Sequence, residues 1–214
     1  MSGKRNRDRR PARRHSFRDP RPVILIVCEG KKTEPQYFYG LRERTKNSRV
    51  RIHCLEGAGV PKTVVAEAKR ELQDAKRRAA AENDDNLAYD AVWCVFDVDE
   101  HPHMREAIQT AHDNGLQLAV SNPCFELWLW LHFKDSPGVI HRHDLQSRLR
   151  GVLGEYDKNV HMDEFAPHIE LAMTRASRLE RDADAADESG RNPTTGVWRL
   201  ARTIMETGFE GTNA

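Results

Sequence analysis

Apolar residues occur along the chain in short continuous runs that are separated by amphipathic segments, which indicates alternating strands and helices. Strands are predicted at residues 23–28, 49–57, 92–97 and 116–121. Between them, apolar residues recur at helical spacing in residues 32–46, 61–81 and 102–113. This alternation predicts an α/β fold whose parallel sheet has about four strands and carries helices on both faces.

The stretch NPCFELWLWLHF, residues 122–133, is apolar on every side and therefore predicts a buried helix. Asn122 suits the N-cap and Pro123 the first helical position. Glu126 and His132 are polar groups on this helix, and each needs a partner. Glu126 fits either a site residue or a carboxylate that complements the positive helix end, whereas His132 is expected to be a hydrogen-bonded core histidine.

Beyond residue 136 the sequence becomes polar, and its pattern predicts helices at residues 143–159, 167–186 and 197–207. We therefore expect three parts: a disordered basic arm at 1–21, an α/β domain at 22–135, and a helical extension packed on that domain at 136–214.

The net charge of +1 conceals a strong asymmetry between the arm and the rest of the chain. Residues 1–21 hold nine Lys or Arg against two Asp, a charge of +7, which leaves −6 on the remainder. Such an arm buries too little apolar surface to order itself. The pattern favours nonspecific contact with nucleic acid, although a solubilising tail or an arm that docks on its own acidic body has the same composition.

The cysteines and the hydropathy pattern predict a cytoplasmic protein. Cys28, Cys54, Cys94 and Cys124 show no C-x-x-C spacing, and three of them lie in apolar runs, where free cysteine behaves as a small hydrophobe. No apolar run approaches the ~20 residues of a membrane span, and the N-terminus lacks the apolar core of a secretory signal. We expect a soluble protein without a membrane partner.

Acidic side chains follow two of the predicted strands. Asp97 and Asp99 stand at the end of strand 92–97 on the same side of the pleat, where their charges repel each other. A divalent cation would relieve this repulsion, and oxygen ligands suit Mg²⁺ or Mn²⁺. Glu29 ends the first strand and is predicted to complete the Mg²⁺ site, because parallel sheets bind ligands at the carboxyl ends of their strands. Alternatively, the Asp pair caps a turn and faces water.

Basic residues near these strands are candidates for phosphate binding. Lys31 and Lys32 follow the Glu-Gly turn, where a cation could meet a phosphate, or they are solvated turn residues. GAGVPKT, residues 57–63, lacks the second glycine of a P-loop, but the helix that it begins could hold a nucleic-acid phosphate next to Lys62.

The HPH sequence that follows the acidic pair offers two imidazoles. His101 and His103 could hold a transition metal, although two histidines at this spacing without further ligands are more often loop residues that face solvent.

A strand that ends in Glu-Gly, followed by a strand that ends in D-x-D, resembles the Toprim fold of topoisomerases, bacterial primases and OLD-type nucleases. More closely, four segments resemble the RloB or AbiLii-like family of bacterial defence proteins, in the family's order: ILIVCEGKKTEPQYF, VWCVFDVDEH, NPCFELWLWLHF and NPTTGVWRL. The resemblance covers about residues 23–205.

This resemblance implies a Toprim-type site in which Glu29 is the general acid or base and Asp97 and Asp99 hold Mg²⁺. Glu126 and Asn122 match the third family motif and are candidates for lining the site. The resemblance also implies a nuclease effector of anti-phage or abortive-infection defence, often controlled by a partner ATPase. We expect RNA, tRNA included, or DNA as the substrate, and we allow for a homo-oligomer.

The residue types agree with a Mg²⁺-dependent nuclease, because Mg²⁺ neutralises a scissile phosphate while a nearby carboxylate moves a proton. A strand-transfer or polymerising reaction would use the same groups. Two other classes stay open, namely a nucleotide- or nucleic-acid-binding regulatory subunit without cleavage and an interaction subunit with a decayed site. No tyrosine stands where covalent DNA cleavage would need it, which argues against a topoisomerase.

Overall fold

The computed structural model describes residues 22–54, 59–98, 103–154 and 156–208. The basic arm, residues 55–58 with the first two residues of the GAGVPKT stretch, Asp99 and His101 lie outside the described residues, so what the sequence predicts for them stays a prediction.

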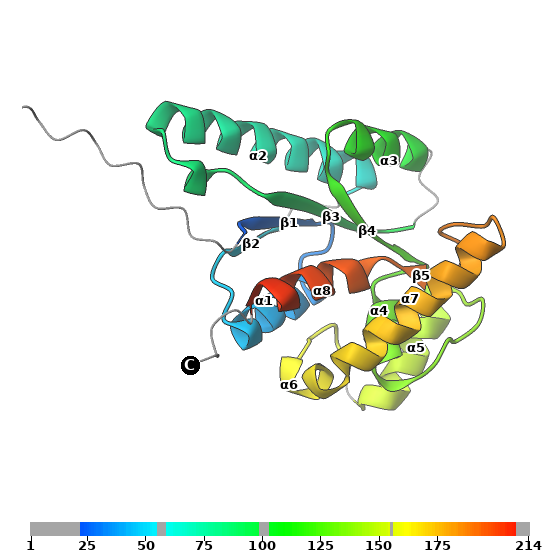
Figure 1. Ribbon diagram of the computed structural model, residues 1–214. Coiled ribbons are helices and arrows are strands. Elements are labelled where there is room, and N and C mark those ends of the chain that lie inside the picture. Colours follow the sequence, from blue (N-terminus) through cyan, green and yellow to red (C-terminus); the bar gives the residue numbers. More distant parts are fainter. Residues whose placement is uncertain (1–21, 55–58, 99–102, 155, 209–214) are drawn as a thin grey trace, which may run out of the picture.

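A five-stranded sheet forms the centre of the fold, with the strand order β2-β1-β3-β4-β5 (Figure 1). The strands are β1 (Ile24–Cys28), β2 (Val50–Cys54), β3 (Ala91–Asp97), β4 (Gln117–Asn122) and β5 (Thr194–Thr195). The first four pair in parallel, and β5 pairs antiparallel with β4. The predicted α/β fold with a parallel sheet is confirmed. The fifth strand is an addition, because two threonines give no periodic pattern.

Helices cover both faces of the sheet, as the sequence predicts (Figure 1). One face carries α2 (Pro61–Glu82) and α3 (Met104–Asp113). The other carries α1 (Thr33–Thr45), α4 (Glu126–Phe133), α7 (Ile169–Ala185) and α8 (Val197–Gly208). Alternate residues of β1 enter the two cores, with Ile26 in one and Val27 in the other. The central strands are therefore apolar throughout.

The C-terminal helices share the second of these cores. Besides α7 and α8 they include α5 (Arg142–Leu153) and the single-turn α6 (Met162–Phe165). Trp128 of α4, Leu145 of α5, Ile169 of α7 and Leu200 of α8 belong to one buried cluster with Ile26 of β1. The sheet and these helices thus bury a single apolar core on this face.

The start of α4 differs from the sequence-based expectation. Asn122 is the last residue of β4 and pairs with Thr194 of β5, and the helix begins only at Glu126. The assignment of Asn122 to the N-cap and of Pro123 to the first helical position is therefore wrong, because sheet pairing holds Asn122 in extended backbone. The peptide between these two residues is cis.

His132 on α4 is a satisfied core histidine, as expected. Its ring is fully buried, and Nδ1 donates to the carbonyl oxygen of Trp128 at 2.9 Å. Nε2 lies 3.2 Å from the hydroxyl of Tyr37 and accepts from it, since the other nitrogen carries the proton. Burial lowers the pKa of His132 to about 3, so the ring is neutral at physiological pH.

None of the helices in the described ranges combines the length and apolar character that a membrane crossing requires.

Candidate functional site

A cavity of about 470 Å³ opens at the carboxyl ends of β1 and β3. Its lining comes from both halves of the chain: Glu29, Gly30, Lys31, Lys32, Thr33, Glu34, Asp97, Phe125, Glu126, Arg142, His143, Gln146 and Lys158. The position agrees with the general rule that open parallel sheets bind ligands outside the carboxyl ends of their strands.

The structure brings together most of the residues that the sequence singled out as catalytic. Glu29, Asp97 and Glu126 line the cavity, and so do Lys31 and Lys32. Asp99 lies outside the described residues.

The two other candidates for substrate binding do not line this cavity. Lys62 donates to the carboxylate of Glu106 on α3 at 2.9 Å, and the side-chain amide of Asn122 donates to the backbone oxygen of Gly190 at 2.8 Å. His103 also contacts Glu106, at 3.1 Å.

The pairing of β1 with β3 positions Glu29. Cys28 stands opposite Val95, and the backbone N–H of Glu29 continues the ladder by donating to the Val95 carbonyl at 2.9 Å. Two residues further along β3, the backbone N–H of Asp97 donates to Oε2 of Glu29 at 3.2 Å. The pairing of β1 with β3 therefore places this carboxylate beside the backbone of Asp97.

Asp97 is surrounded by charge of both signs. Oδ2 accepts from Nη2 of Arg142 at 2.9 Å, and the Asp97 side chain is 19 % exposed. Burial raises the pKa of Asp97 well above its usual range, the negative charges of Glu34 and Glu126 add to this effect, and Arg142 opposes it. This carboxylate is one that a cation would stabilise in its ionised form.

The position of Glu126 agrees with both interpretations that the sequence left open, and its role stays a prediction. It is the first residue of α4, where a carboxylate complements the positive helix end, and it also faces the cavity. Its Oε1 accepts from the amide of Gln146 at 3.0 Å and from the hydroxyl of Tyr156 at 3.4 Å. Burial raises the pKa of Tyr156, so this hydroxyl remains a donor.

Glu34 is a fourth carboxylate of the cavity that the sequence-based interpretation did not include. It lies in the first turn of α1 and is 8 % exposed. Burial raises the pKa of Glu34 to about 7, and the charges of Glu126 and Glu29 contribute. Glu34 follows the Glu-Gly turn closely in the sequence, and this position could have marked it as a candidate for the site. The helix pattern alone identifies it only as a residue at the start of a helix.

Gly30 makes room for Glu34. A Cβ atom at this position would overlap the Glu34 carboxylate, so the second residue of the Glu-Gly turn has to lack a side chain for the carboxylate to lie where it does.

Basic side chains also line the cavity. Lys31 and Lys32 come from the turn after β1, and Nζ of Lys32 donates to the backbone oxygen of Asp157 at 3.1 Å. Arg142 and His143 begin α5, and Lys158 follows that helix. Sequence reasoning missed these last three because nothing in an amphipathic pattern tells which distant strand end a helix will face.

The residues of the cavity fit a hard divalent cation such as Mg²⁺ by their chemistry. Their ligand atoms are carboxylate oxygens. Burial chiefly raises the pKa values of Glu34 and Asp97, and the neighbouring carboxylate charges raise them further. Within the described residues, no three of these carboxylates have ligand atoms within 4.8 Å of one another. A separate group, His53, Glu67 and Glu71, meets that spacing away from the cavity.

The fold and the cavity define a mostly parallel α/β protein with a cavity at its strand ends that is lined by charges of both signs. Within this class, the model of the RloB-like protein family matches residues 24–204, and the chain belongs to that family. The resemblance of the four sequence segments is thereby confirmed. Searches of curated proteins and of solved structures gave no match.

Proposed function

We propose that the protein is a Mg²⁺-dependent nuclease of the Toprim type that cleaves phosphodiester bonds of RNA or DNA. The observation that carries the proposal is the mixture of charges in one cavity, where four carboxylates lie beside the cations of Lys31, Lys32, Arg142 and Lys158. Carboxylates suit the metal, and the cations suit the phosphates of the substrate.

Glu29 and Asp97 would hold the ion, together with Asp99 of the D-x-D sequence. When bound, Mg²⁺ neutralises charge on the scissile phosphate and on the leaving oxygen. The chain's own part is to orient the phosphodiester through the lysines and Arg142, and to move a proton. The family resemblance gives the proton transfer to Glu29. Glu34 is a second candidate, because a pKa of about 7 lets it accept and release a proton near neutral pH.

A second function, a regulatory subunit that binds a nucleotide or nucleic acid without cleaving it, is favoured by one contact. Arg142 already neutralises Asp97 through the hydrogen bond of 2.9 Å. A cavity in this state can bind a phosphate through its cations with no metal.

A cleavage and binding assay on the full chain separates the two functions. We expect RNA or DNA to be cut with Mg²⁺ and left intact with EDTA, and Asp97→Asn to abolish the cutting. Asp182→Asn is the matched control, since Asp182 is exposed on α7 and far from the cavity lining. Binding that is unaffected by EDTA, without cleavage of either nucleic acid, would select the regulatory function.

We also propose a role as an effector of anti-phage or abortive-infection defence, with an ATPase partner that restrains the nuclease. Uncontrolled expression should then arrest growth of a bacterial host, while the Asp97→Asn variant is tolerated. Equal toxicity of both chains would contradict an effector role for this site.

A further inference from the structure

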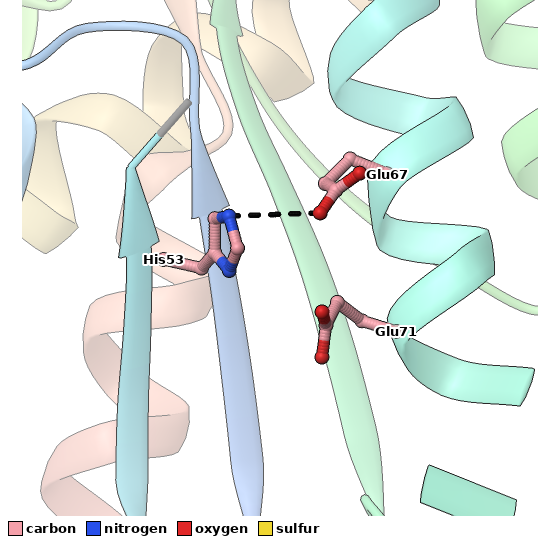
Figure 2. Close-up of side chains that lie close together, drawn as sticks. All are labelled: His53, Glu67 and Glu71. Carbon is pink, nitrogen blue, oxygen red and sulfur yellow. Dashed lines mark ion pairs between the residues drawn. The ribbon is translucent and has the colours of Figure 1, made fainter. Parts of the chain in front are cut away.

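Three side chains with metal-binding atoms meet between the edge strand β2 and helix α2 (Figure 2). His53 comes from β2, and Glu67 and Glu71 lie one turn apart on α2 with their carboxylates directed at the imidazole. One ligand atom from each lies within 4.8 Å of the other two. The group is separate from the acidic cavity, whose lining includes none of the three.

Strand register and helical periodicity bring these residues together. His53 pairs with Val27 of β1, and side chains of paired residues point to the same face of a sheet. Val27 belongs to the core beneath α2, so His53 faces α2 as well. Glu67 and Glu71 are four residues apart and are therefore neighbours on the helix surface.

We propose that His53, Glu67 and Glu71 bind a first-row divalent transition-metal ion of the Zn²⁺ class. Nε2 of His53 and Oε1 of Glu67 are 3.6 Å apart. Two ligands of a tetrahedral zinc ion, each at about 2.0–2.1 Å from the metal, stand about 3.3 Å from each other. Small side-chain movements therefore suffice to place both atoms on one ion.

The donor set decides the class of metal. An imidazole nitrogen favours Zn²⁺ and similar ions over Mg²⁺ and Ca²⁺, which prefer oxygen ligands only. Three protein ligands also leave a coordination position for water. The side chains are partly shielded, with His53 37 % and Glu67 16 % exposed, so the ion would be held between two elements of the fold.

One cation competes for this site. Nη2 of Arg70 donates at 2.5 Å to Oε1 of Glu67, the same oxygen that faces His53. Metal binding has to displace this contact, and the Arg70 charge repels a divalent ion. Removal of the Arg70 side chain is therefore expected to strengthen metal binding.

Titration of the full chain with Zn²⁺ alone, followed by calorimetry, tests the site. We expect one equivalent to bind and to raise the Tm, since the ion ties β2 to α2. His53→Gln and Glu71→Gln should each lose this equivalent. The matched controls are His112→Gln and Glu82→Gln, which change exposed residues of α3 and α2 outside the group, and both should bind like the parent. Arg70→Ala should bind Zn²⁺ several-fold more tightly.

An NMR titration of the parent chain with Zn²⁺ follows the His53 imidazole directly and needs no variant. A shift of its ring resonances together with the loss of binding in the two ligand variants supports the site. The proposal is overturned if the parent binds no Zn²⁺, if the His53 ring does not respond, or if His53→Gln binds as tightly as the parent. The last result would leave His53 and Glu67 as an ion pair only.

Discussion

The burial of Glu34 makes the stability of the folded chain depend on pH. Its pKa rises from 4.5 to about 7, chiefly through burial, so between these two values the folded protein binds more protons than the unfolded chain. The stabilising contribution of this group is complete below about pH 4.5. It is lost as the pH rises to about 7, and the loss amounts to about 3 kcal/mol.

Glu34→Gln should remove this loss in metal-free protein. We expect the variant to be more stable than the parent at pH 8 and nearly equal to it at pH 4.5. Urea unfolding in EDTA at the two pH values measures the difference. Glu82→Gln on the exposed surface of α2 controls for the general effect of one charge. A variant whose stability follows the parent's across both pH values would show that Glu34 ionises normally.

A substitution at Gly30 tests the role of the Glu34 carboxylate by displacing it. Gly30→Ala should force the Glu34 side chain out of its place, because the added Cβ overlaps it, and should thereby slow cleavage, in which Glu34 is a candidate for moving the proton. Gly151→Ala is the control: it lies in α5, where a Cβ meets nothing within 4 Å, and should stabilise the helix by roughly 0.5–1 kcal/mol. Unchanged cleavage by Gly30→Ala would show that Glu34 takes no part in the reaction.

At the scale of elements, the sequence predicts the strands and helices that show a regular pattern of apolar residues. The four longer strands are apolar or alternating over five to seven residues, and their positions follow from this pattern. Strand β5 does not, because its two residues gain their strand character only from pairing with β4. The start of α4 was misplaced for a related reason, since Asn122 has good N-cap chemistry but is held by the sheet.

The residues of the cavity also fall into those that the sequence could predict and those that it could not. Glu29 and Asp97 could be predicted because a strand end has a defined place in a parallel sheet. Arg142 and His143 could not, because their position depends on how α5 packs, and that packing is decided by its buried apolar residues such as Leu145 and Leu149. Glu34 could not be predicted either, because only the folded structure shows that its side chain is buried.

Helix α5 therefore carries a prediction of its own. Arg142→Ala removes a charge-assisted hydrogen bond and a cation proposed to bind phosphate, and should reduce cleavage about 10–100-fold. Arg142→Lys keeps the charge, loses the planar fork, and should recover part of the activity. Arg148→Ala serves as control, since Arg148 of the same helix contacts only the backbone oxygen of Pro137 at 3.5 Å among the contacts described. If Arg142→Ala cleaves like the parent, α5 is a scaffold and not part of the site.

At the scale of the whole molecule, one core joins the sheet to the C-terminal helices. Ile169 and Leu200 are buried with Trp128 and Ile26, so a chain that ends at residue 135 would expose a large apolar surface. We expect residues 22–135 alone to show no cooperative unfolding transition by circular dichroism or calorimetry. A sharp transition in this fragment would show that the α/β part folds by itself.

The N-terminal arm, unlike the C-terminal helices, should contribute nothing to the stability of the fold. Deleting residues 1–21 removes a charge of +7 and no part of the described core. Thermal stability should stay the same, while nucleic-acid binding weakens and its logarithm falls less steeply with the logarithm of salt concentration. An unchanged salt slope would assign the arm some other role.

The cavity is completed by α5, which the ribosome makes well after Glu29 and Asp97. A nascent chain that still lacks residues 142–158 has its acidic strand ends but not Arg142, His143 or Lys158, which line the finished cavity. The complete cavity therefore forms only after residue 158 has been synthesised. Under the proposed nuclease function, an unfinished chain still lacks Arg142 and Lys158, two of the cations proposed to hold the phosphates of a nucleic acid.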